Sequence, residues 1–232
     1  MSRGTTAQQS ALIAYPRQAA FGRVLPKNKI YEHSGANTRL KDLFVAQVEQ
    51  IVWQYKLAPE TVNVPARPGV PEIQIFSIQL KTPELHCDVL RCIDGAVQFP
   101  ILFELHRGQG DQARTQVVAA YKRPSEVDAS RWVLSDYFAT DWLPAVSPRI
   151  AMPLALDMAQ LYAALLQRLM PLPARLQEPL ADWVARVELA AAKRREVEKT
   201  ASKLAKEKQF NRKVEINATL RQLQTELEQL SR

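Results

Sequence analysis

Apolar residues recur at helical spacing in the segment from Leu40 to Lys56. Positions three or four apart lie on one face of a helix, so the pattern predicts an amphipathic helix over residues 40–56. Asn37 and Thr38 stand before it as candidate N-terminal caps. The positions that form the apolar face are Leu40, Phe44, Val48, Ile51, Val52 and Tyr55.

Two further segments have the same helical pattern. Thr82 as N-cap and Pro83 at the first helical position open a short helix, which Gly95 is expected to end. Residues 154–169, entered through Pro153, predict a longer amphipathic helix. We expect this helix to pack on a sheet.

Strand patterns occupy most of the region between these helices. Residues 72–80 are rich in β-forming side chains, and residues 99–106 alternate apolar residues on one face. The turn at 108–111 leads into a returning strand over 116–122, and residues 132–142 are predicted as the next strand. The order helix, strand, helix and three strands predicts an α+β fold with one mostly antiparallel sheet and packed helices.

The chain from Leu180 to Arg232 contains neither Pro nor Gly, and it predicts a long C-terminal helical or coiled-coil extension. Its apolar residues follow two phases that cannot share one straight seam. Either a single helix stutters between Lys206 and Val214, or the chain turns near Asn211 into a helical hairpin. The missing Gly and Pro favour the stutter. The second phase is the predicted seam for a partner or for homo-oligomerisation, and its residues are Ile216, Leu220, Leu223, Leu227 and Leu230.

These patterns divide the chain into an N-terminal arm over residues 1–37, an α+β core domain over 38–175 and a basic helix or coiled coil over 176–232. No window approaches the roughly 20 apolar residues that span a bilayer, and the N-terminus has no apolar segment of the signal-peptide type. We therefore expect a cytoplasmic protein without a membrane contact.

Charge is concentrated in residues 193–213, which hold nine Lys or Arg and three Glu, whereas the whole chain has a net charge of +7. A concentrated basic helix suggests an acidic partner, most simply nucleic acid. The alternative is that these cations are solvated positions of a coiled coil whose apolar seam contacts protein. The candidate nucleic-acid-binding residues are Arg194, Arg195, Lys199, Lys203, Lys206, Arg212 and Lys213.

Common enzyme signatures are missing from the sequence: there is no phosphate-binding glycine loop, no nucleophile elbow and no pair of Cys or His at zinc spacing. We expect no metal ion and no cofactor. The remaining enzyme hypothesis is a restriction-type nuclease, in which carboxylates hold Mg²⁺ beside a lysine. Its candidate residues are Glu72, Glu104 and Lys122. The alternative is that Glu104 and Lys122 lie on the polar face of a half-exposed hairpin.

Several short segments together resemble one family of bacterial proteins, the domain of unknown function family 4391. The resemblance runs over almost the whole chain and rests on the segments 25–29, 43–44, 51–63, 72–76, 89–94, 103–105, 120–123 and 206–215. It implies a gene neighbourhood with a DNA methyltransferase and a helicase, in loci that look like restriction or phage-defence systems. It implies no catalytic residue.

The function expected from these observations is a non-enzymatic accessory subunit that mediates protein assembly in a DNA methyltransferase and helicase complex of phage defence. The role of the basic segment stays open between contact with DNA and contact with protein. One alternative is an active or degenerate Mg²⁺-dependent nuclease. Another is an inhibitor or immunity protein that binds its enzyme partner directly.

Overall fold

The computed structural model describes residues 11–125, 127–128 and 131–232 of the chain. It divides into two compact units, Met1–Leu169 and Met170–Arg232. No helix among the described residues is long and apolar enough to cross a membrane.

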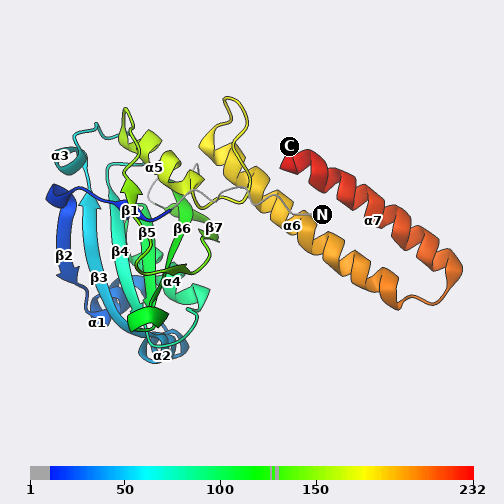
Figure 1. The fold of residues 1–232 in the computed structure, drawn as a ribbon, viewed down its shortest axis with the longest axis horizontal. Helices are drawn as coiled ribbons and strands as arrows, with labels where there is room; N and C mark the ends of the chain where they lie inside the picture. The colour runs from blue at the N-terminus through cyan, green and yellow to red at the C-terminus, as the bar shows by residue number, and fades with distance from the viewer. Residues whose placement is uncertain (1–10, 126, 129–130) are drawn as a thin grey trace. The chain divides into compact units, whose positions relative to one another are not determined.

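Unit 1 is built on a seven-stranded sheet with the strand order β2-β3-β4-β5-β6-β7, in which β8 also pairs with β6 (Figure 1). Strands β1 (Ile13–Ala14) and β9 (Ile150–Ala151) form a separate two-stranded sheet. The strands of the seven-stranded sheet are β2 (Ala20–Val24), β3 (Val48–Leu57), β4 (Ile73–Leu80), β5 (Ile101–Arg107), β6 (Arg114–Pro124), β7 (Trp132–Ala139) and β8 (Leu143–Pro144). Only the β4–β5 pair of the seven-stranded sheet is parallel among the described strands. The predicted mixed fold with a mostly antiparallel sheet is confirmed.

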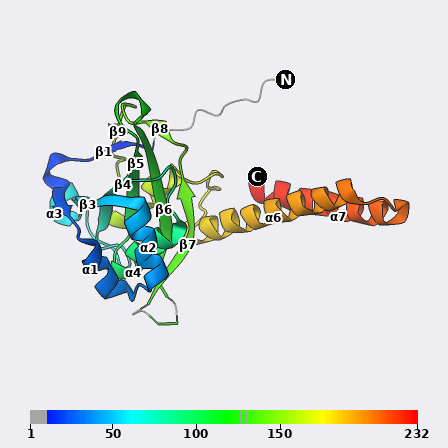
Figure 2. The ribbon, with the colours of Figure 1, turned by 90° about the horizontal axis from the view of Figure 1, so that it is seen from below.

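The helices of unit 1 are α1 (Lys27–Ser34), α2 (Thr38–Gln47), α3 (Pro59–Val62), α4 (Cys87–Ala96) and α5 (Met158–Gln167), with short 3-10 turns η1 (Arg17–Ala19) and η2 (Gly110–Gln112). Helix α4 connects the parallel strands β4 and β5, because a parallel pair needs a crossover rather than a hairpin turn. Helices α1 and α2 both contact α4, as Figure 1 and Figure 2 show from two directions.

The hydrophobic core lies between these three helices and one face of the sheet. Side chains alternate along a strand, so Phe76 of β4 and Phe103 of β5 point to the same face. They cluster there with Ile30, Phe44 and Ile93 from α1, α2 and α4.

The opposite face of the sheet is contacted by α5. The Tyr162 hydroxyl donates to the Ala120 carbonyl at 2.8 Å and accepts from the Lys122 backbone N–H at 2.9 Å. The Tyr162 ring also lies beside the ring of Tyr121 on β6. The helix predicted over residues 154–169 therefore packs on the sheet as expected. It begins at Met158, with Asp157 as its N-cap, rather than at Leu154.

The predicted helix over residues 40–56 is wrong in its second half, because the helix ends at Gln47 and β3 follows at once. Strand β3 pairs with both β2 and β4, and its register shifts between Val48 and Gln50 and between Trp53 and Tyr55. Such bulges add a residue to one strand and break the period of two. Because of these bulges, the apolar residues of β3 recur at intervals of three and four residues, which is the spacing typical of a helix.

The short helix predicted from Thr82 starts later, at Cys87, with His86 as its N-cap. The Thr82 hydroxyl instead donates to the Glu84 carbonyl in a turn. Gly95 lies inside α4, which ends one residue later.

The N-terminal segment takes part in unit 1. Strand β1 pairs with β9, β2 is the edge strand beside β3, and α1 contacts α4. Residues 1–10 of the predicted arm lie outside the described residues.

Unit 2 is a helical hairpin of α6 (Leu180–Lys206) and α7 (Phe210–Ser231), preceded by an irregular segment (Figure 1). The prediction of one stuttering helix is wrong, and the alternative of a hairpin is confirmed. The chain turns through Glu207, Lys208 and Gln209 without Gly or Pro. The Glu207 side-chain Oε1 accepts from the backbone N–H groups of Lys208 at 2.8 Å and Gln209 at 2.9 Å, which fixes this turn.

Candidate functional site

Four of the predicted nucleic-acid-binding residues form one stripe along α6. Arg195, Lys199, Lys203 and Lys206 are separated by four, four and three positions, and residues at this spacing lie on one side of a helix. All four side chains are exposed, and among the described residues none of the four takes part in a salt bridge. We call this set the outer stripe of α6.

The outer stripe points away from the apolar side of α6. Val197, Thr200 and Leu204 are half-buried and follow their own 3-4 spacing toward α7. Lys193 lies on the α7 side as well, where its Nζ reaches Glu226 Oε2 of α7 at 2.8 Å. The basic stretch therefore includes one cation that links the two helices and four that face solvent together.

The other three candidate cations lie off this stripe. Arg194 is exposed on the flank of α6, whereas Arg212 and Lys213 are exposed in the first turn of α7. The positive charges of Arg212 and Lys213 help to lower the pKa of Glu207, although the two backbone N–H bonds to its carboxylate lower that pKa more.

The predicted seam lies on a single face of α7. Leu220 is buried, and Ile216, Leu223, Leu227 and Leu230 are half-buried. Since α6 and α7 run side by side (Figure 1), these side chains are covered within the same hairpin.

The structure places Glu104 in an ion pair on the α5 side of the sheet. Its carboxylate receives two parallel hydrogen bonds from the Arg149 guanidinium, at 2.7 and 2.6 Å. The Glu104 side chain is 6% exposed. The same guanidinium donates to the Ile13 carbonyl of β1, and its bond to Glu104 raises the pKa of Arg149. Glu104 thereby connects β5 to the β1–β9 pair.

Lys122 lies on the other face of the sheet from Glu104. Glu104 pairs with Val117 of β6, and Lys122 is five positions further along that strand, so alternation turns it to the opposite side. Its Nζ donates to the carbonyls of Asp94 and Val97 at the C-terminal end of α4. A cation at this end stabilises the helix, because the last carbonyls carry partial negative charge.

Asp94 is the charged partner of Lys122, with its Oδ1 3.5 Å from the Lys122 Nζ. Its Oδ2 accepts from the Tyr137 hydroxyl at 2.5 Å. Burial raises the pKa of Asp94 to about 6, against the lowering effect of the Lys122 charge. Burial likewise lowers the pKa of Lys122. The Lys122 side chain thus joins the C-terminal end of α4 to strand β6 through its contacts with Asp94 and Val97.

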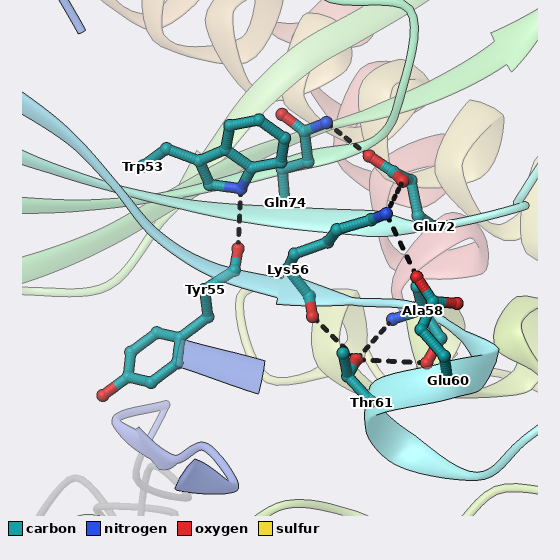
Figure 3. A network of polar contacts seen from close by, with 8 residues as sticks. All are labelled: Trp53, Tyr55, Lys56, Ala58, Glu60, Thr61, Glu72 and Gln74. Atoms are coloured by element: carbon teal, nitrogen blue, oxygen red, sulfur yellow. Dashed lines mark hydrogen bonds and ion pairs between the residues drawn. The ribbon is translucent and has the colours of Figure 1, made fainter. Parts of the chain in front are cut away.

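Glu72 lies in a third place, a polar network at the start of β4 (Figure 3). Its carboxylate accepts from the Gln74 amide at 2.5 Å and lies 3.3 Å from the Lys56 Nζ. Lys56 also pairs with Glu60 of α3 at 3.1 Å, which raises the pKa of Lys56. Thr61 closes the network by donating to the Lys56 carbonyl and accepting from the Ala58 N–H.

The three nuclease candidates are therefore not brought together, since each has its own partners: Gln74 and Lys56 for Glu72, Arg149 for Glu104, and Asp94 for Lys122. Among the described residues, no group of three or more His, Cys, Asp and Glu is placed to hold a metal ion. The helix predicted over residues 40–56 hides the role of Lys56 beside Glu72. Read as a strand, residues 48–57 pair Lys56 with Gln74.

Comparison with known proteins identifies a family but no individual relative. No curated protein and no solved structure matches the chain. A family model, described as a domain of unknown function (DUF4391), matches residues 13–227, which include the sheet of unit 1 and all but the last residues of the hairpin of unit 2. The match covers most of the 232 residues, and the chain belongs to the DUF4391 family.

Proposed function

We propose that the chain is a non-enzymatic accessory subunit of a DNA-modification or phage-defence complex in the cytoplasm, and that its hairpin contacts DNA through the outer stripe of α6. The proposed partners are DNA methyltransferase and helicase subunits, as the family resemblance suggests. In this proposal α6 and α7 pair as a short antiparallel coiled coil that presents the stripe.

The outer stripe is the observation that carries the proposal. From Arg195 to Lys206 it extends for about 16 Å at 1.5 Å per residue, a length equal to about five base pairs of duplex. Four exposed cations in a row match the regular negative charge of a phosphate backbone. Such contacts position a protein on DNA but read no sequence.

The absence of aromatic residues on the stripe favours duplex backbone as its ligand. Trp183 is the only aromatic residue within α6, and it is buried, with its Nε1 donating to the Leu172 carbonyl. Proteins that bind single strands usually add stacking side chains to their basic groups.

Binding to a mixed-sequence 20-base-pair duplex, measured by fluorescence anisotropy across a salt series, tests the proposal. Each phosphate contact contributes about 0.9 to the slope of log affinity against log salt, so Lys199→Gln, Lys203→Gln and Lys206→Gln together should reduce the slope by about 2.7. The matched control neutralises three exposed arginines of unit 1, Arg17, Arg23 and Arg39. Equal affinity and slope in wild type and the lysine triple variant would refute DNA contact through the stripe.

A further inference from the structure

The turn between α6 and α7 presents an aromatic side chain to solvent. Phe210 is the first residue of α7 and is 76% exposed. Phe21, the next most exposed aromatic residue among those described, is 43% exposed and packs against the Trp53 ring. Val214, one helical turn after Phe210, is 54% exposed. The end of the hairpin thus carries a small apolar surface.

Basic residues lie on both sides of Phe210 along the chain. Lys206, Lys208, Arg212 and Lys213 are exposed, and the only acidic residue among positions 206–213 is Glu207. The Glu207 carboxylate is already occupied by the two backbone N–H groups of the turn. The cations of the turn therefore remain available to an anionic ligand.

A flat apolar ring within a group of cations is complementary to a ligand that carries phosphates and exposed ring faces. Unpaired nucleotides have both, whereas a continuous duplex covers the faces of its bases by stacking. We propose that the hairpin tip, defined as residues Lys206–Lys213, binds single-stranded DNA with Phe210 stacked on an unpaired base and the four cations on its phosphates.

The inference deepens the proposed DNA contact and rests on it, but it assigns a different ligand to a different part of the hairpin. The outer stripe holds duplex backbone, and the tip holds a base that has left the duplex. Lys206 belongs to both surfaces, so the two ligand segments are adjacent. A protein with this arrangement prefers a junction between double- and single-stranded DNA over either alone.

The test uses the full chain and a fluorescein-labelled 12-nucleotide oligothymidine, with the 20-base-pair duplex as second ligand. Loss of one stacked base weakens binding by about 5- to 150-fold, so Phe210→Ala should lower the affinity for oligothymidine by that factor and leave the affinity for the blunt duplex unchanged. Phe210→Trp should retain single-strand binding. Val214→Ala, which removes an exposed apolar group from the same surface, is the matched control and should have little effect.

Unchanged affinity of Phe210→Ala for oligothymidine would overturn the inference, as would an equal loss for both DNA ligands. Binding of the wild type to vesicles of anionic phospholipid that Phe210→Ala abolishes, without change in oligothymidine binding, would assign the tip to a lipid surface and also overturn it. The lysine triple variant separates the two proposals: if its duplex affinity and salt slope equal those of the wild type, the stripe proposal fails, whereas the tip is judged on Phe210 alone. Because Phe210 is exposed, an unchanged circular dichroism spectrum is expected for its variants.

Discussion

The guanidinium of Arg186 donates to the main-chain carbonyl of Leu230 at 2.8 Å, across 44 positions of sequence. Arg186 lies in the second turn of α6, and Leu230 lies near the end of α7. The same guanidinium binds both carboxylate oxygens of Glu178 and the Pro173 carbonyl. One buried side chain thus holds together the segment before α6, the start of α6 and the end of α7.

Replacing Arg186 should open this end of the hairpin. Arg186→Met keeps the length of the side chain but leaves the carboxylate of Glu178, whose side chain is 9% exposed, without its cation, and breaking a buried ion pair costs about 3 kcal/mol. We expect faster hydrogen exchange at the C-terminal amides of α7, measured by mass spectrometry of its peptides. Arg221→Met, at an exposed position of α7, is the control. Equal protection of α7 in the Arg186 variant and the wild type would contradict this role.

The Glu178–Arg186 pair also predicts a pH dependence. The hydrogen bonds from Arg186 lower the pKa of Glu178 from the ordinary 4.5 to about 2. Because the folded pKa lies below the unfolded one, the pair stabilises the hairpin above about pH 4.5, and this contribution is lost as the pH falls toward 2. At pH 7 the wild type should exceed Glu178→Gln by about 1–2 kcal/mol in the free energy of unfolding. Urea titrations at several pH values measure it, and a pH-independent difference would refute the assignment.

The local pattern of apolar and polar residues predicts some elements of this fold and not others. Strands β4 to β7 have regular alternation or β-rich composition, so their positions could be predicted from sequence. Strand β3 could not, because two bulges break its alternation. The turn between α6 and α7 has no glycine or proline to mark it in the sequence. The Glu207 side chain stabilises it instead, by accepting hydrogen bonds from two backbone N–H groups.

The candidate site residues also differ in how far their arrangement can be predicted from the sequence. The spacing of Arg195, Lys199 and Lys203 is visible in the sequence, and only the hairpin shows which side of α6 is free. No local signal pairs Arg149 with Glu104, since the two residues are 45 positions apart and join different strands.

The Glu104–Arg149 pair should matter for stability. Arg149→Met leaves a buried carboxylate without a partner, which costs about 3 kcal/mol. Glu104→Gln keeps an acceptor for the guanidinium and should cost less. Thermal unfolding by circular dichroism compares the two variants, with exposed Arg39→Met as control. A larger loss for Glu104→Gln than for Arg149→Met would contradict this account.

The last prediction concerns the buried pair of Lys122 and Asp94. The folded pKa of Asp94, about 6, lies above its ordinary value of 3.8, so its ionisation opposes folding, and the free energy of unfolding should fall as the pH rises from about 4 to 6. Lys122→Met removes the main group that lowers this pKa, and the titration midpoint of Asp94, followed by carbon NMR of its carboxyl group, should move upward.

Lys122→Met should also weaken the C-terminal end of α4, because two carbonyls lose their cation in a buried site. Lys81→Met is a close control: the Lys81 Nζ donates to the Val45 carbonyl near the end of α2, but from an exposed position. Since water replaces an exposed donor at little cost, the Lys81 variant should lose much less stability in urea unfolding. Equal losses of stability in the Lys122 and Lys81 variants, together with an unchanged titration midpoint of Asp94, would contradict this account. They would show that neither the burial nor the charge of Lys122 determines the stability and titration of the pair.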